Sequence, residues 1–393
     1  MSISYEKVLS RRAQDLKPSG IRKFFDMLEE MKDVVALTVG QPDFQTPWHI
    51  REAGILALEK GKTYYTSNAG TLELREEIVK YLDRRFSLTY DAKSEILVTV
   101  GGSEAIDLAI RALVNEGDEV ILPTPCFVCY DPIIHLTGGK TVEIPLKEEN
   151  NFRLTADELK AAITDKTKLL ILPFPANPTG AIMEKADMEA IAEVLRGTDI
   201  MVLTDEIYAE LTYGKKHFSF ASIPDMRERT VVVNGFSKAY AMTGWRMGFT
   251  AAPAPITREM FKIHQFAVMC APTTSQMAAI EALKAGDEDI AEMKAEYNRR
   301  RTLLVERLRA MGLQCFTPEG AFYVFPNISG FGMTSEQFCE KLLMEYGVAI
   351  VPGTAFGDCG EGYARISYAY SMKHINEALD RMENMLSDLK GRR

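Results

Sequence analysis

The chain has 393 residues, more than the roughly 250–300 that a single hydrophobic core usually supports, so two domains are expected. Hydrophobic residues make up 46% and charged residues 26%, as in an ordinary soluble globular protein. The net charge of −9, with no block of Lys or Arg beyond short pairs, argues against a protein that binds nucleic acid through its phosphates.

The cysteines and the apolar runs predict a cytoplasmic protein. Six cysteines are scattered along the chain, and Cys126 and Cys129 form an isolated C-x-x-C without a second pair. We therefore expect neither a disulfide scaffold nor a zinc site, and we expect no other metal. The N-terminus lacks an apolar signal core, and no apolar run is long enough to span a membrane.

Short apolar runs alternate with amphipathic stretches through the first two thirds of the chain. The runs predict buried strands at residues 95–100, 119–123, 168–172, 200–204 and 230–233. The stretches predict helices, among them residues 103–114, 155–163 and 185–196. This alternation predicts an α/β fold, with a mostly parallel central sheet covered by helices on both faces. Ligands bind such sheets beyond the carboxyl ends of the strands.

The last third of the chain has a different pattern. One or two helices are predicted at 273–311, then a strand at 321–325, a helix at 335–346, strands at 348–352 and 363–368, and a helix at 373–389. We therefore expect a large domain at 44–285 and a smaller α+β domain at 286–393. The first segment, 1–43, is too short for a domain and is expected to pack on the small one.

Polar residues follow the first two predicted strands. Gly-Gly-Ser-Glu-Ala at 101–105 opens a helix, and the backbone N–H groups of Gly102 and Ser103 suit a phosphate there. An ordinary turn and helix cap is the alternative. Phe127 could stack on a pyridine ring, although an ordinary core Phe is favoured by the residues alone.

The next two strands end in motifs with amide and carboxylate groups. In the rigid loop 173–180, Asn177 could point its amide at a ligand oxygen, or it could be a turn residue before proline. Asp205 could pair with a pyridine nitrogen and keep it protonated, or it could be a helix N-cap. Tyr208 could hydrogen-bond a phenolic oxygen.

The segment 234–249 carries the strongest chemical signal. A lysine in an apolar loop, Lys238, is easily deprotonated and can form a Schiff base with an aldehyde. Ser237 and Arg246 suit a phosphate. An aldehyde and a phosphate together describe pyridoxal 5′-phosphate (PLP), whereas a chance Lys-Ala pair and a surface arginine are the alternative.

Arg365 lies inside an apolar strand pattern and needs a partner there. A guanidinium binds a carboxylate with two parallel hydrogen bonds, so the α-carboxylate of a substrate is a suitable partner. An internal salt bridge is the alternative.

Together these motifs resemble class I aminotransferases of PLP fold type I, in the prokaryotic branch that includes aspartate and aromatic amino acid aminotransferases. The resemblance runs nearly end to end. It rests on residues 18–24, 40–44, 65–70, 73–75, 177–180, 205–208, 237–238, 243–246, 320–323, 351–353 and 365–368.

The resemblance implies a role for each candidate residue. Lys238 holds PLP and shuttles a proton between Cα and C4′, Asp205 pairs with the pyridinium nitrogen, and Phe127 replaces a stacking aromatic residue. Asn177 and Tyr208 contact the phenolic oxygen. The phosphate is held by Gly102, Ser103, Ser237 and Arg246.

The resemblance also implies the substrate site and the assembly. Arg365, Asn177 and the backbone of Gly40 receive the α-carboxylate. Tyr65 reaches the phosphate in the neighbouring subunit, so a homodimer is expected.

Two departures from the family pattern stand out. Many relatives have Ser at the position of Gly235, so Ser237 is the expected hydroxyl donor. Some aspartate-preferring relatives have Lys at the position of Ser103. Its absence, with Phe127 where the aspartate enzymes often have Trp, tilts the expectation towards aromatic or broad substrates.

The predicted reaction is amino transfer between an L-amino acid (aromatic, aspartate or broad) and a 2-oxo acid such as 2-oxoglutarate. A PLP-dependent C–S β-lyase of the same fold is the alternative enzyme. A transcription regulator built on this fold would need a DNA-binding domain before Gly40, and about 40 residues leave no room for one.

Overall fold

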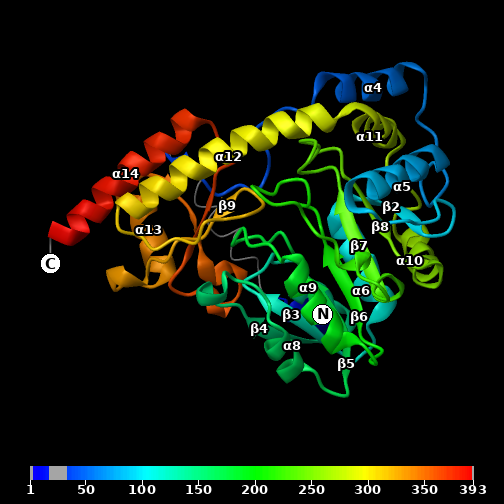
Figure 1. The fold of residues 1–393 in the computed structure, drawn as a ribbon, viewed down its shortest axis with the longest axis horizontal. Coiled ribbons are helices and arrows are strands. Elements are labelled where there is room, and N and C mark those ends of the chain that lie inside the picture. The colour runs from blue at the N-terminus through cyan, green and yellow to red at the C-terminus, as the bar shows by residue number, and fades with distance from the viewer. Residues whose placement is uncertain (1–2, 17–32, 392–393) are drawn as a thin grey trace.

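The computed structural model describes residues 3–16 and 33–391. Its main feature is a seven-stranded sheet with the order β2-β8-β7-β6-β5-β3-β4 (Figure 1). The strands are β2 (Ile96–Val100), β3 (Glu119–Thr124), β4 (Lys140–Pro145), β5 (Thr167–Leu172), β6 (Met201–Asp205), β7 (Thr230–Gly235) and β8 (Met247–Ala251). Only β8 runs antiparallel to its neighbours, so the predicted mostly parallel α/β fold is confirmed.

All five strands predicted for this sheet are present, but the sequence missed two others. Strand β4 lies at the sheet edge and only Ile144 of its six residues is buried, so it shows no continuous apolar run. Strand β8 is fully buried, but its sequence Met-Gly-Phe-Thr-Ala is interrupted by glycine and threonine. Apolar continuity, which revealed the other strands, is absent from both.

Helices cover both faces of the sheet, as alternate residues of each strand dictate. One face packs against α6 (Gly101–Leu113), α7 (Tyr130–Thr137) and α10 (Ala254–Ala267). The other packs against α5 (Leu72–Phe86), α8 (Ala156–Ala162), α9 (Lys185–Leu195) and α11 (Thr273–Ala285). Helix α4 (Trp48–Glu59) lies on the outside of α11 (Figure 1).

The long helical pattern at 273–311 forms two helices. Helix α11 ends at Gly286, and α12 (Asp287–Ala310) begins directly after it and runs from the large sheet to the C-terminal part (Figure 1). Glycine is a poor helix former, and a Cβ at this position would lie 2.7 Å from the carbonyl oxygen of Ala282. The close packing around Gly286 therefore favours glycine at this position, where the two helices are separated.

The C-terminal part is built on a small antiparallel sheet. Its order is β11-β12-β9, from β9 (Tyr323–Val324), β11 (Val351–Pro352) and β12 (Ala364–Ser367). Helices α12, α13 (Ser335–Tyr346) and α14 (Met372–Gly391) pack around it. The run predicted as one strand at 348–352 is divided into β10 (Val348–Ala349) and β11.

Short 3-10 helices complete the described elements. They are Glu148–Asn150, Phe220–Ser222, Arg227–Arg229, Ser329–Phe331, Gly353–Phe356 and Asp358–Gly360.

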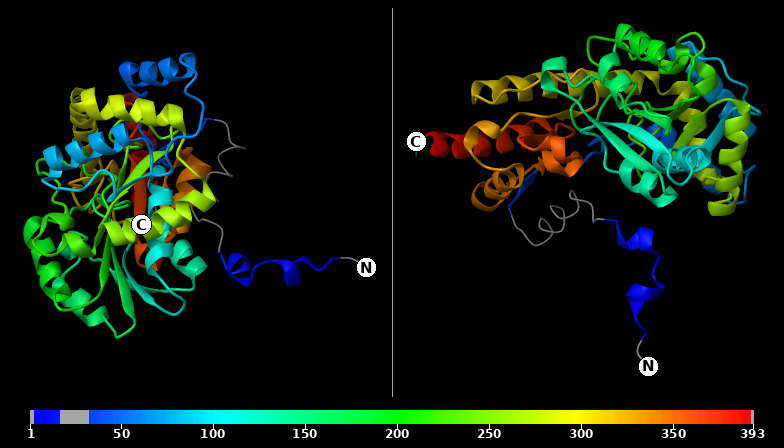
Figure 2. Two further views of the ribbon diagram at one scale, coloured as in Figure 1. Left: turned by 90° about the vertical axis from the view of Figure 1, so that its right-hand side faces the viewer. Right: turned by 90° about the horizontal axis from the view of Figure 1, so that it is seen from below.

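The N-terminal segment makes contacts with both parts of the molecule. Strand β1 (Val35–Ala36) pairs with β10, as expected for packing on the C-terminal part. The chain leading to the N-terminus extends from the body (Figure 2); it carries the helices α1 (Tyr5–Val8) and α2 (Arg11–Gln14), of which α2 contacts α7. Arg12 contacts Leu136 on α7 of the large sheet instead, so this end of the segment departs from the expectation. The motif at 18–24 lies outside the described residues, and the domain boundaries stay a prediction.

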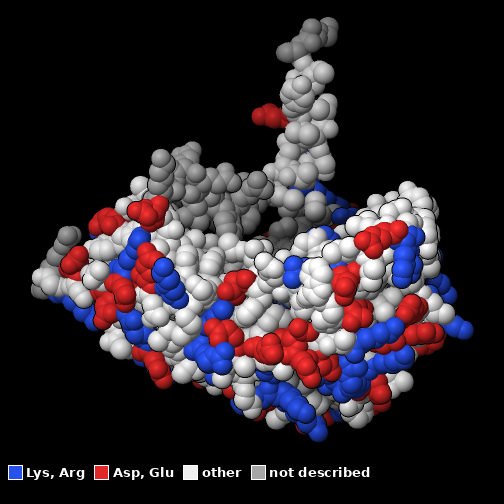
Figure 3. Space-filling view, turned by 90° about the horizontal axis from the view of Figure 1, so that it is seen from above, with Lys and Arg blue, Asp and Glu red and all other residues white. Residues whose placement is uncertain are grey.

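Charges of both signs are interspersed over the face shown in Figure 3. Within the described residues, no helix is both long enough and apolar enough to cross a membrane. All six cysteines are free thiols.

Candidate active site

A cavity of about 360 Å³ lies beyond the carboxyl ends of the parallel strands. The predicted site residues that line it are Gly40, Gly102, Ser103, Phe127, Asn177, Asp205, Tyr208, Ser237, Lys238, Arg246 and Arg365. Tyr65 does not, and its side chain is 77% exposed. Residues from five strand ends and from the C-terminal part thus converge on one space.

One side of the cavity has the features of an anion site. Helix α6 begins at Gly101, directly after β2, and its first N–H groups have no partners within the helix. Gly101 has a φ of 76°, and a Cβ there would lie 2.6 Å from Nη2 of Arg246. The guanidinium, the helix N-terminus and the hydroxyls of Ser103 and Ser237 therefore surround a space that suits a phosphate.

Lys238 occupies the centre of the cavity. Its Nζ donates a hydrogen bond of 2.6 Å to the carbonyl oxygen of Gly40. Burial, together with the nearby positive charges of Arg365 and Arg246, lowers the pKa of the Lys238 amine to about 8, against the opposing effect of Asp205. A substantial fraction of this amine is therefore neutral near physiological pH.

Asp205 ends β6 and is fully buried. The Tyr130 hydroxyl donates to Oδ2 at 2.7 Å, and the backbone N–H of Ile207 donates to Oδ1 at 3.1 Å. Burial raises the pKa of the carboxyl, while these two hydrogen bonds oppose the rise. No helix follows β6 directly, so the N-cap interpretation of Asp205 is wrong.

Arg365 is buried and has only neutral partners. Its Nη1 donates to Oδ1 of Asn177 at 2.9 Å and its Nη2 to the carbonyl oxygen of Thr38 at 2.5 Å. Its Nε is buried without a hydrogen-bond partner, and no carboxylate among the described residues pairs with it. The alternative of an internal salt bridge is therefore not supported, and the guanidinium is free to bind an external anion.

Two tyrosines form the wall beside Arg365. The Tyr208 and Tyr323 hydroxyls lie 2.8 Å apart, and burial raises the pKa of both phenols. The Arg365 guanidinium lies over the Tyr323 ring, 4.5 Å from its centroid. Tyr208 thus lies where the sequence expected it, with a partner from a segment 115 residues away.

Two further positions bear on the departures noted in the sequence. Phe127 lines the cavity and meets the Tyr130 ring edge-on, with 6.2 Å between centroids. A Cβ on Gly235 would lie 2.9 Å from the carbonyl oxygen of Met247. A serine at 235 would therefore be crowded in this chain, whereas Ser237 faces the cavity.

The charge of the cavity suits the cofactor expected from the sequence. Among the described lining residues, the cations are Lys238, Arg246 and Arg365, and Asp205 is the single acid. Such an excess of positive charge fits a ligand set with two anionic groups. PLP, which carries a phosphate, fits this set of charges, and a substrate carboxylate would supply the second anionic group.

Sequence reasoning missed three residues that shape the site. They are Tyr130, which bonds Asp205; Tyr323, which bonds Tyr208; and Thr38, which accepts from Arg365. The position of Tyr130, three residues after Phe127, could have indicated it. The contribution of Thr38 is a backbone carbonyl, for which a sequence holds no signal.

Comparisons with known proteins identify the family of this chain. The profile of the family described as aminotransferase class I and II matches residues 32–382. The chain is 48% identical to an aspartate aminotransferase of Pyrococcus abyssi, over 97% of this chain and 99% of the relative. It is 44% identical to aromatic-amino-acid aminotransferase 2 of Thermococcus litoralis, over 97% and 99%. The solved structure of an aromatic aminotransferase from Pyrococcus horikoshii matches with a TM-score of 0.90 at 47% identity, over 93% of this chain and 99% of that chain.

Proposed function

The chain belongs to the class I and II aminotransferases, and on that premise we propose that its cavity transfers an amino group between an L-amino acid of the aspartate or aromatic type and a 2-oxo acid such as 2-oxoglutarate. Enzymes of this family use PLP. One observation carries the proposal: a lysine with a lowered pKa, a single carboxylate and an arginine without an acidic partner share one cavity.

Three groups of residues would hold the cofactor. The start of α6, Ser237 and Arg246 would hold the phosphate, Asp205 would pair with the ring nitrogen, and Asn177 and Tyr208 would contact the phenolic oxygen. When bound, PLP supplies an aldehyde that takes up the amino group and a ring that accepts electrons.

Proton transfer falls to Lys238. Its pKa of about 8 lets the amine take a proton from the substrate Cα as a neutral base and return one as an ammonium. The Asp205 carboxylate is the only acid among the described lining residues, so it keeps a proton on the ring nitrogen by charge attraction. Tyr130 supports that role by donating to Asp205.

Substrate orientation falls to Arg365. The substrate α-carboxylate would pair with its guanidinium, beside Asn177 and the Gly40 backbone, and the unpartnered Nε offers a further donor. The named relatives differ in substrate at similar identity, one aspartate and one aromatic amino acids, so overall similarity does not choose between them.

The homodimer and the cytoplasmic location are part of this proposal. Tyr65 is 77% exposed, and Phe266 on α10 is 87% exposed. Other large apolar side chains are exposed in the same stretches of chain, namely Tyr64, Leu72, Val268 and Met269. A second copy covering them would remove this apolar surface from water.

A spectral screen tests the proposed reaction. Each amino acid is added to the PLP form of the enzyme without an oxo acid, and conversion to the pyridoxamine form is followed by absorbance. We expect aromatic amino acids, aspartate or both to convert the cofactor. Release of pyruvate and ammonia without an oxo acid would contradict the proposal and favour β-elimination.

Substitution of the lysine tests its role in the same assay. Lys238→Ala should remove steady turnover and the visible absorption of lysine-linked PLP. Lys262→Ala, on the exposed side of α10, is the control and should retain both. Turnover by the Lys238 variant at the wild-type rate would remove this residue from its proposed role.

A further inference from the structure

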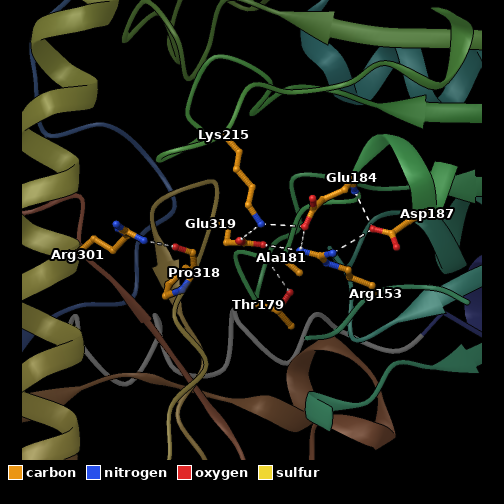
Figure 4. A network of polar contacts seen from close by, with 9 residues as sticks. All are labelled: Arg153, Thr179, Ala181, Glu184, Asp187, Lys215, Arg301, Pro318 and Glu319. Carbon is orange, nitrogen blue, oxygen red and sulfur yellow. Dashed lines mark hydrogen bonds and ion pairs between the residues drawn. The ribbon is translucent and has the colours of Figure 1, made fainter. Parts of the chain in front are cut away.

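Four charged side chains outside the lining of the cavity form a closed ring of ion pairs (Figure 4). The Arg153 guanidinium lies 2.9 Å from Oε2 of Glu319 and 2.7 Å from Oε1 of Glu184. Lys215 Nζ lies 2.6 Å from Oε1 of Glu319 and 2.8 Å from Oε1 of Glu184. Two cations and two carboxylates therefore alternate, and none of the four residues lines the cavity.

The four members come from four separate segments. Arg153 precedes α8, Glu184 is the N-cap of α9, and Lys215 lies in the loop after β6. Glu319 is the member nearest in sequence to a cavity residue, because it lies four residues before Tyr323. A charge change at Glu319 therefore acts on a loop that reaches the site.

The backbone of Glu319 is bound to the loop 173–180. The N–H groups of Glu319 and Gly320 both donate to the carbonyl oxygen of Gly180, at 2.9 and 2.8 Å. A Cβ on Gly180 would lie 2.4 Å from Pro318 Cβ, so the two backbones are in close contact. Such packing leaves neither segment room to move alone.

Both segments hold the arginine that is proposed to bind the substrate carboxylate. The loop 173–180 carries Asn177, whose Oδ1 accepts from Arg365. The segment 318–323 carries Tyr323, whose ring lies under the guanidinium. The position of Arg365 thus depends on how firmly these two segments are joined.

The ring is suited to hold them together. The side chains of Arg153 and Glu319 are 17% and 21% exposed, so their attraction is less screened than that of an ion pair in open solvent. Hydrogen bonds to Glu184 and Glu319 raise the pKa of Lys215, so this member stays charged over the working pH range. Arg301 on α12 adds a hydrogen bond of 2.6 Å to the carbonyl oxygen of Pro318.

We propose that Glu319 is a positioning residue for the binding of the substrate α-carboxylate. Its partners Arg153 and Lys215 also pair with Glu184, which follows the loop 173–180, so the ring ties the segment 318–323 to that loop. The joined segments keep Arg365 in its binding position. Glu319 touches neither substrate nor cofactor. The inference rests on the proposed role of Arg365, and the experiment below separates the two.

Glu319→Gln in the holoenzyme tests the proposal, because glutamine keeps the size of the side chain and removes its charge. We expect the KM for the preferred amino acid to rise about five- to tenfold, with kcat changed less than about twofold. A matching probe is the analogue of the preferred amino acid that keeps the carboxylate but lacks the amino group. Its Kd, measured by calorimetry, should rise by the same factor. A purely structural role would leave this Kd unchanged.

Two further variants keep the test decisive. Lys215→Met breaks one of the two ion pairs of Glu319 and should give a smaller rise in the same KM and Kd, even if Glu319→Gln folds poorly. Glu95→Gln is the matched control, because Glu95 pairs with Arg227 at 2.5 Å but precedes β2 at the end of the sheet away from the cavity. It should leave KM and Kd unchanged.

The outcomes separate the inference from the proposed function. The positioning role is overturned if Glu319→Gln and Lys215→Met lower the melting temperature but leave KM and Kd unchanged. It is also overturned if Glu95→Gln raises KM and Kd as much as the ring variants do. Arg365→Met tests the carboxylate site itself. If that variant binds the carboxylate as the wild type does, the role of Arg365 fails; if it binds weakly and Glu319→Gln binds normally, only the positioning role fails.

Discussion

At the scale of single residues, the site depends on charges that are buried with few partners. Lys238 and Arg365 are both cations within one cavity, and each donates to backbone carbonyl oxygens, of Gly40 and Thr38 respectively. Their mutual repulsion and burial favour the neutral form of the lysine, because the guanidinium holds its proton far more strongly. The lysine is thereby prepared to react as an amine.

The pH dependence of cofactor attachment follows from this arrangement. Below a pKa of about 8 the Lys238 amine is mostly protonated and unreactive, so the rate of PLP attachment to the apoenzyme should rise with pH and level off above about 8. Stopped-flow absorbance at a series of pH values measures it. Arg365→Met removes a positive charge that lowers the pKa of Lys238. In this variant the midpoint of the pH dependence of the attachment rate should therefore move to higher pH.

The control for this experiment is Arg258→Met, on the exposed side of α10, which should leave the midpoint unchanged. A wild-type midpoint near 10.5, the ordinary lysine value, would contradict the lowered pKa.

At the scale of elements, strand β8 packs against the start of α6, on the side of the cavity where the phosphate is proposed to bind. Gly248 of β8 passes so close to the start of α6 that a Cβ there would lie 2.5 Å from the carbonyl carbon of Gly101 and 2.7 Å from the N of Gly102. Both contacts are with backbone, which cannot turn aside as a side chain can. The strand that the sequence missed thus determines where α6 begins, at the side of the cavity where the phosphate is proposed to bind.

Gly248→Ala should therefore push the α6 terminus out of place. We expect a loss of about 1–3 kcal/mol in the free energy of unfolding, as for other overpacked cores, together with weaker PLP binding. Urea unfolding and absorbance titration with PLP measure the two effects. Gly244→Ala, in the same segment but with open space around it, is the matched control and should change neither.

At the scale of the whole molecule, the proposed homodimer would complete each active site with a residue from the other subunit. Tyr65 lies outside the cavity of its own chain and is 77% exposed, as expected for a residue that serves a neighbouring subunit. The exposed aromatic and apolar side chains near it would lie at the contact between copies. Dimer formation and cofactor binding should then be linked.

Tyr65→Phe tests this linkage. Loss of one hydrogen bond to a charged phosphate should weaken PLP binding by roughly tenfold or more. Sedimentation of the variant should still show a dimer. Tyr64→Phe removes the hydroxyl of the neighbouring tyrosine, which is also exposed, and should bind PLP normally. A monomeric wild-type protein that binds PLP fully would contradict the shared site.

The sequence by itself determined the parallel sheet and most of the residues around its cavity. Five buried strands show as apolar runs, and motifs at their carboxyl ends must meet at one edge because parallel strands all end there. The sequence alone therefore predicts that Asn177, Asp205 and Lys238 lie in one site.

Only the tertiary structure decided how these residues are held. Tyr130 meets Asp205 across 75 residues and Tyr323 meets Tyr208 across 115, contacts that no local pattern encodes. The neutral partners of Arg365 and the ion-pair ring around Glu319 likewise join segments far apart in the chain. Periodicity records which face of an element is buried, whereas the pairing of particular polar atoms depends on how the packed elements meet in space.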